Sequence, residues 1–112
     1  MKKKFILITA VLLAAIVYYG CEKKEEQPPV PPPAPPVADF TYEITNHATR
    51  TVKFTNASLY AHSYSWDFGD AGTSTQISPQ HSYPSYGNYT VRLTAHGEGG
   101  TNTATKTVAV TP

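Results

Sequence analysis

The sequence predicts an antiparallel β-sandwich over residues 38–112. Apolar and polar residues alternate there in short runs, which is the period of strands that bury one face. Clusters of turn-forming residues separate the runs, and no stretch of this part repeats apolar residues at the 3.6-residue period of a helix. About seven short strands divided by turns are typical of two packed antiparallel sheets, so we predict an all-β domain.

Each expected strand places its apolar residues on one side. In chain order these residues are Phe40, Tyr42 and Ile44; Val52 and Phe54; Tyr64, Trp66 and Phe68; and Tyr89, Val91, Leu93 and Ala95, followed by a threonine- and valine-rich run at 103–110. Turn-forming residues lie between them at 45–47, 69–72, 85–88 and 97–100. Most strands therefore offer an aromatic ring to the core, and we expect Trp66, the only tryptophan, at its centre.

Three motifs in this part carry a family resemblance. They are Trp66-Asp67-Phe68-Gly69-Asp70, Pro79-Gln80-His81-Ser82-Tyr83 and Gly87-Asn88-Tyr89-Thr90-Val91-Arg92-Leu93-Thr94. In this order they resemble the PKD domain, a family first named from the polycystic kidney disease protein, and the similarity covers about Val37 to Thr111. The resemblance implies an immunoglobulin-like sandwich, in which Trp66 and Phe68 are core residues of a central strand and Gly69-Asp70 starts the next turn.

The same resemblance implies structural roles for nine motif residues. These are Trp66, Asp67, Phe68, Gly69, Asp70, His81, Tyr83, Gly87 and Tyr89. We expect His81 to be a structural hydrogen-bonding group. Members of the family usually continue with a glycine where this chain has Ala71 and then Gly72, so the turn is the place where a local rearrangement is expected. PKD domains commonly act as non-catalytic modules beside enzymes or adhesins.

Enzymatic interpretations of the aspartates fail on their context. Asp67-Phe68-Gly69 matches the metal-binding signature of protein kinases, but no glycine-rich phosphate loop, paired lysine or catalytic-loop Asp and Asn accompanies it. A two-carboxylate hydrolase needs carboxyls that face each other across a cleft. Asp67 instead leaves its strand on the face opposite Trp66, and Asp70 lies in a turn, where aspartates ordinarily cap backbone N–H groups. We therefore predict that the chain is not an enzyme and uses no cofactor.

Calcium binding is the alternative chemistry for these carboxylates, because loop carboxylates suit a hard cation. The available ligands are Asp39, Glu43, Asp67, Asp70 and Glu98. They do not reproduce a ligand set of the family. The four histidines, at positions 47, 62, 81 and 96, have no metal-ligand spacing. We predict no metal site, and calcium binding stays an open alternative.

The beginning of the chain predicts export. Three lysines at 2–4 precede an uncharged apolar run of 15 residues from Phe5 to Tyr19, and Gly20-Cys21 follows. This is the pattern of a secretory signal peptide, which we place at 1–20. The run is short for a membrane span, which needs about 20 residues. A transmembrane anchor is the rival interpretation.

Cys21 is the only cysteine and so has no partner for an internal disulfide. The segment before it resembles a bacterial lipoprotein signal, which implies that Cys21 is lipidated and begins the mature protein. Tyr18 and Tyr19 depart from that signal, which usually has Leu and a small residue there, and an incidental cysteine is the alternative. Without residues 1–20, six basic residues face eight acidic ones. This net charge of −2 predicts no nucleic-acid partner, and leaves the acyl chains to attach the protein to a membrane.

Residues 21–37 are predicted to form a linker. Seven of the ten residues from Pro28 to Val37 are proline, which favours an extended polyproline II spacer over a docking site for a partner that recognises proline. Lys24-Glu25-Glu26 resembles the short signal that sends some lipoproteins to the surface of Gram-negative bacteria, and a solvating charged collar is the alternative. The expected location is the cell envelope, as an outer membrane lipoprotein exposed at the surface.

Two functions remain for the domain at 38–112. It is a binding module for a protein or carbohydrate ligand, or a passive structural spacer in an envelope complex. Tyrosine offers flat, amphipathic contact area at low entropic cost, and we expect Tyr60, Tyr83 and Tyr86 in or near loops. These three residues are the candidate ligand contacts, and the alternative is that they pack over the ends of the sandwich.

Overall fold

The computed structural model describes residues 28–112, so the predicted signal peptide at 1–20 and Cys21 lie outside the described residues. Residues 32–112 form one compact unit. Its seven strands are β2 (Phe40–Asn46), β3 (Thr51–Asn56), β4 (Ser63–Asp67), β5 (Thr73–Ser74), β6 (Gln80–Ser82), β7 (Gly87–Gly97) and β8 (Gly100–Val110). No helix in the described part of the chain is long and apolar enough to cross a membrane.

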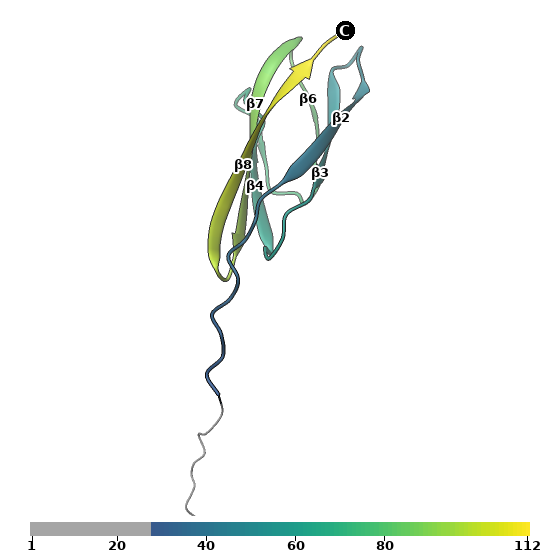
Figure 1. Cartoon of the computed structure of the whole chain (residues 1–112). Helices are drawn as coiled ribbons and strands as arrows, with labels where there is room; N and C mark the ends of the chain where they lie inside the picture. The colour runs from purple at the N-terminus through teal and green to yellow at the C-terminus, as the bar shows by residue number, and fades with distance from the viewer. Residues whose placement is uncertain (1–27) are drawn as a thin grey trace, which may run out of the picture. The chain divides into compact units, whose positions relative to one another are not determined.

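The strands form two antiparallel sheets, ordered β2-β3-β6 and β5-β4-β7-β8, with the core between them (Figure 1). The predicted all-β antiparallel sandwich is confirmed. The five longer strands occupy the alternating runs, with Phe68 one residue beyond the end of β4. β5 and β6 have only two and three residues, which is too short for an alternation to show in the sequence.

The core forms from the inward-facing residues of both sheets. Its members are Phe40, Val52, Phe54, Trp66, Phe68, Tyr83, Val91, Leu93, Val108 and Val110. The Trp66 ring centroid lies 5.2 Å from that of Phe40 and 5.4 Å from that of Phe54, both of which belong to the opposing sheet. The indole N–H of Trp66 donates to the carbonyl of Gln76 at 2.9 Å. The largest core residue therefore packs on apolar rings and still satisfies its polar atom.

Side chains bridge the edge strands β2 and β8, which belong to different sheets. In β8, every second residue directs its backbone polar groups away from β7. The hydroxyl of Tyr42 donates to one such carbonyl, that of Thr107, at 3.3 Å. The ammonium of Lys106 donates to the carbonyl of Phe40 and lies 3.2 Å from the carboxylate of Asp39. A long exposed edge strand invites pairing with other chains, and these bridges cover part of it.

The folded unit begins six residues before the predicted boundary at Ala38. Pro36 is buried, and Val37 pairs with Leu59 through two backbone hydrogen bonds of 2.9 and 2.8 Å. The proline content of 32–37 predicted a free spacer. Extended backbone also packs against a sheet edge, however, and here Val37 supplies the N–H that its proline neighbours lack.

At two glycines of the β7–β8 hairpin, the backbone of another segment packs in close contact. A Cβ at Gly99 would lie 2.3 Å from the carbonyl oxygen of Ala34, and a Cβ at Gly97 would lie 2.2 Å from that of Tyr60. Any larger residue would push these segments away. We call this the N-terminal end of the sandwich, because the chain enters the compact unit here, whereas Pro112 leaves at the opposite, C-terminal end (Figure 1).

A chain that starts at Ala38 should be less stable than one that starts at Pro32. It lacks two backbone hydrogen bonds, each worth about 1 kcal/mol, and also the burial of Pro36. We therefore expect a loss of at least about 2 kcal/mol in the free energy of unfolding. Urea unfolding followed by Trp66 fluorescence measures this loss. A chain that starts at Pro28 is the control and should match the Pro32 chain, whereas equal stability of all three would contradict the early start of the folded unit.

Candidate functional site

The motif Trp66–Asp70 forms the end of β4 and a tight turn after it. Gly69 has a φ of +86°, which side chains disfavour. A Cβ at Gly69 would also lie 2.6 Å from the carbonyl oxygen of Thr90. Oδ1 of Asp67 accepts the N–H of Gly69 at 3.0 Å. The first aspartate of the motif therefore holds the turn that the glycine makes possible.

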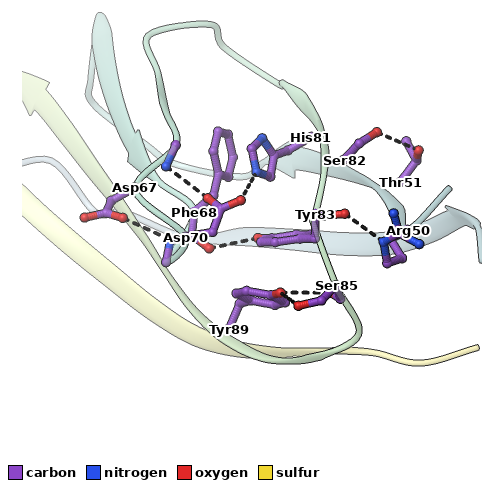
Figure 2. Close-up of polar contacts among 12 residues, drawn as sticks. Arg50, Thr51, Asp67, Phe68, Asp70, His81, Ser82, Tyr83, Ser85 and Tyr89 are labelled. Carbon is purple, nitrogen blue, oxygen red and sulfur yellow. Dashed lines mark hydrogen bonds and ion pairs between the residues drawn. The ribbon is translucent and has the colours of Figure 1, made fainter.

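The second aspartate, Asp70, links the two sheets. Its Oδ1 accepts the N–H of Gly72 at 3.0 Å, and its Oδ2 accepts the Nε2–H of His81 at 2.8 Å (Figure 2). His81 lies on β6 of the other sheet, and its ring stacks on that of Phe68 with centroids 4.2 Å apart and planes inclined by 12°. Both oxygens of Asp70 are thus engaged, and His81 is a structural hydrogen-bonding group.

The pKa of Asp70 lies below its ordinary value of 3.8. Burial is the largest single effect and raises the pKa, since only 10% of the side chain is exposed. The hydrogen bonds from His81 and from the N–H of Gly72 favour the charged form and together outweigh burial. The carboxylate is therefore ionised at neutral pH and serves as a fixed acceptor.

Tyr83 is buried, so its prediction as a ligand contact is wrong. Only 1% of the residue is exposed, and its hydroxyl donates to the carbonyl of Phe68 at 3.0 Å. Its ring stacks on that of Tyr89 with centroids 4.1 Å apart. Burial raises the pKa of Tyr83. The physical reason is its position directly after β6. Its side chain is buried in the core, and its hydroxyl bonds to Phe68, the residue that follows β4.

The polar groups of the family motif therefore bind one another. Asp67 and Asp70 each cap backbone N–H groups, and the arrangement holds the end of β4 against β6. Within residues 28–112, no three His, Cys, Asp or Glu side chains come together in a way that would hold a metal ion. This network is therefore held together by hydrogen bonds among its own residues.

At the C-terminal end, Tyr86 is exposed but fixed in place. The residue is 43% exposed, its hydroxyl donates to the carbonyl of His47 at 3.1 Å, and the guanidinium carbon of Arg50 lies 5.4 Å from its ring centroid. Nε of Arg50 in turn donates to the carbonyl of Tyr83 at 2.8 Å (Figure 2). Nδ1 of His47 donates to the carbonyl of Thr111 at 2.7 Å. We name Tyr86, Arg50 and His47 the tip cluster.

Sequence reasoning missed Arg50. Its φ of 56° is unusual for a residue other than glycine, and its carbonyl accepts the N–H of Tyr83 at 3.0 Å. These contacts depend on the pairing of β3 with β6, which brings together segments far apart in the sequence. The only local signal was a charged residue at the end of the turn at 47–50.

Tyr60 lies at the N-terminal end, away from the tip cluster. It is 64% exposed, and its carbonyl approaches Gly97 at the end of β7. Tyr86 instead precedes Gly87 at the start of β7, a strand of 11 residues. A strand of this length spans about 35 Å. The three candidate tyrosines are therefore separated, with one in the core and one at each end.

Comparisons with known proteins identify the sandwich. The sequence model of the PKD domain matches residues 32–112. The crystal structure of the PKD1 domain of Vibrio anguillarum Epp is 37% identical with a TM-score of 0.62, and the match covers 70% of this chain and 95% of that one. The PKD1 domain from the Vibrio cholerae metalloprotease PrtV is 33% identical with a TM-score of 0.62, and the match covers 70% of this chain and 100% of that one.

The curated relatives are much longer proteins. A microbial collagenase of Vibrio alginolyticus is 54% identical over 46 residues, which make up 40% of this chain and 6% of the collagenase. Collagenase ColA of Bacillus cereus is 50% identical over 38 residues, or 34% of this chain and 4% of that protein. The chain thus spans only a small fraction of the length of the collagenases it matches.

Asp70→Asn should make the free energy of unfolding less dependent on pH between about pH 5 and about pH 3. Because the pKa of Asp70 is lower in the folded than in the unfolded chain, its stabilisation is complete above the ordinary value of 3.8 and is lost as the pH falls through the folded value. Asparagine keeps an oxygen for the N–H of Gly72 but carries no charge. Urea unfolding between about pH 5 and about pH 3 should therefore show a smaller loss of unfolding free energy in the variant.

Asp39→Asn is the matched control for this measurement. Hydrogen bonds from the side chain of Lys106 and the N–H of Phe40 also lower the pKa of Asp39. This carboxylate is exposed to solvent, however. Asp39→Asn should therefore change the pH dependence of the unfolding free energy less than Asp70→Asn does. If the unfolding free energy of Asp70→Asn fell with decreasing pH as steeply as that of the parent, the Asp70–His81 contact would add nothing to stability.

Proposed function

The chain belongs to the PKD domain family, and from this premise we propose that it is a non-catalytic binding module held at the cell surface by a lipid anchor. PKD domains are typically non-catalytic, and in bacterial proteins they often serve as binding or spacer modules. The proposed ligand is a protein or carbohydrate outside the cell, and the tip cluster is its contact surface.

The exposed and fixed ring of Tyr86 carries this proposal. Arg50 and the carbonyl of His47 hold the ring in place. An aromatic side chain that is rigid before binding loses little entropy when a partner covers it. A domain tethered through its N-terminal end would direct this cluster away from the tether.

A fibrous protein is the ligand that we favour for the tip cluster. Tyrosine and arginine are the residues that most often dominate the energy of protein contacts, and the cluster presents one of each. The curated relatives described above are named collagenases. Collagen is therefore the first protein to test, and carbohydrates are the second class.

The lipid anchor rests on residues 1–26, which lie outside the described residues. The lysines at 2–4, the apolar run at 5–19 and Gly20-Cys21 support export and lipidation of Cys21. Lys24-Glu25-Glu26 supports an outer membrane location with exposure at the surface. Acyl chains on one cysteine supply the hydrophobic attachment that a chain with a net charge of −2 does not obtain from charge.

A passive spacer is the second candidate function. The burial of Pro36 and the pairing of Val37 with Leu59 make the last part of the proline-rich segment continuous with the domain. This continuity suits an element that sets the distance between an anchor and a partner subunit. Such an element needs no ligand, so binding measurements separate the two functions.

Cys21→Ser should abolish incorporation of labelled palmitate and move the protein from the membrane fraction to the soluble fraction, because the acyl chains have no other cysteine to attach to. Asp70→Asn, a change within the folded unit, is the control and should incorporate as much labelled palmitate as the parent. Labelling that survives Cys21→Ser would refute the anchor. Protease treatment of intact cells then tests surface exposure, since a chain that stays protected until lysis is not on the outside.

Tyr86→Ala should weaken binding to immobilised collagen by about tenfold or more, as expected for an aromatic contact worth at least about 1.4 kcal/mol. Tyr60→Ala is the matched control, because it removes an exposed tyrosine from the opposite end, and its binding should equal that of the parent. A parent chain that binds neither collagen nor any glycan on an array would favour the spacer.

A further inference from the structure

A depression of about 570 Å³ lies on the outer face of the sheet β5-β4-β7-β8. We name it the sheet-face groove. Its lining includes the polar residues Ser65, Asp67, Thr73, Thr75, Arg92 and Thr94. Its volume lies within the range of small-molecule binding sites.

Strand register sets which side chains meet in the groove. Trp66 and Leu93 are directly paired and point into the core, where they are 1% and 0% exposed. Because successive side chains of a strand point to opposite faces, their neighbours point outward. Asp67 is paired with Arg92 on one side and with Thr73 on the other. A carboxylate, a guanidinium and a hydroxyl therefore form one row across three strands.

The two charges of this row are open to a ligand. No ion pair within residues 28–112 includes Arg92. Asp67 uses Oδ1 to accept the N–H of Gly69, and its second oxygen is a further acceptor. The groove thus offers a strong donor and a strong acceptor on neighbouring strands, beside a set of hydroxyl groups.

The groove offers little to a polypeptide. Trp66 and Asp67 pair with β5 on one side and with β7 on the other, so their backbone groups cannot pair with an added strand. The large exposed hydrophobic residues of the described chain all lie outside the lining. A protein partner would therefore find neither main-chain hydrogen bonds nor an apolar anchor here.

We propose that the sheet-face groove binds a saccharide through Asp67 and Arg92. Adjacent hydroxyls of a sugar ring can donate to a carboxylate and accept from a guanidinium at the same time. The lining hydroxyls add further donors and acceptors, and the methyl groups of Thr73 and Thr94 can contact the C–H face of the ring. Trp66 belongs to the lining but is only 1% exposed, so it offers no ring face for stacking. We therefore expect weak binding, with a dissociation constant of about 1 mM.

This site is separate from the tip cluster, which lies in loops at the C-terminal end. The inference rests on the proposed function only in treating the domain as a binding module. It requires neither Tyr86 nor a lipid on Cys21. Its success or failure can therefore be told apart from that of the tip cluster.

Amide chemical shifts of a ¹⁵N-labelled chain that starts at residue 21, with Cys21→Ser to prevent lipidation, test the inference. Related PKD domains have been crystallised as isolated domains, so a partner is not needed for folding. The probes are maltotriose, cellotriose and triacetylchitotriose, each added to about 20 mM, well above the expected dissociation constant. At least one probe should shift the amides around Asp67, Thr73 and Arg92 and leave that of Tyr86 unmoved.

Two variants and one control complete the test. Arg92→Gln and Asp67→Asn should each weaken binding of the responding probe about tenfold, since each removes a charge-assisted hydrogen bond. Asparagine at 67 keeps an oxygen for the turn, so this variant decides the matter if Arg92→Gln does not fold. Lys53→Ala, which removes an exposed charge from β3 of the other sheet, should bind like the parent.

Three outcomes would overturn the inference. The first is that no probe shifts any amide at about 20 mM. The second is that the shifts appear around Tyr86 instead of the groove. The third is that both groove variants bind as tightly as the parent.

Discussion

The hydrogen bond from the Tyr83 hydroxyl to the Phe68 carbonyl, with the Asp70–His81 contact beside it, fixes how the two sheets lie against each other. β4 and β6 belong to different sheets, so no backbone ladder joins them. Trp66 packs against rings of the opposing sheet, but the hydrophobic effect that drives this burial is not directional. Buried hydrogen bonds are directional and costly to leave unmade, so these two select one arrangement of the sheets.

The same constraint divides the two aspartates of the motif by function. Asp70 accepts a hydrogen bond on each of its two oxygens, and these bonds hold the turn after β4 to β6. Asp67 precedes Phe68 and leaves β4 on the outer face, where one of its oxygens holds the turn at Gly69 and the residue lines the groove. Alternation along a strand therefore places one carboxylate in the framework and leaves the other beside Arg92.

The features that follow from the local pattern of apolar and polar residues could be predicted from the sequence. The features that depend on which strands pair with each other could not. A half-buried strand shows its period in the sequence, so the sandwich and the central place of Trp66 were predicted. Tyr83 follows a strand of three residues, and nothing local indicates that it turns inward. The tip contacts of Arg50 and the row formed by Asp67 and Arg92 depend on which strands become neighbours, a property that a single sequence does not display.

Each of the two proposed binding surfaces includes a residue that the core network does not use. Tyr86 stands in the loop before β7, and Arg92 points outward from β7 between buried neighbours. Substitutions at such positions alter the surface without disturbing the contacts that order the sheets. The same sandwich can therefore occur within a metalloprotease, within collagenases and in this chain while its surfaces diverge. Likeness in the Trp66–Asp70 motif thus reports the fold, whereas the proposed ligand contacts lie at the tip and on the sheet face.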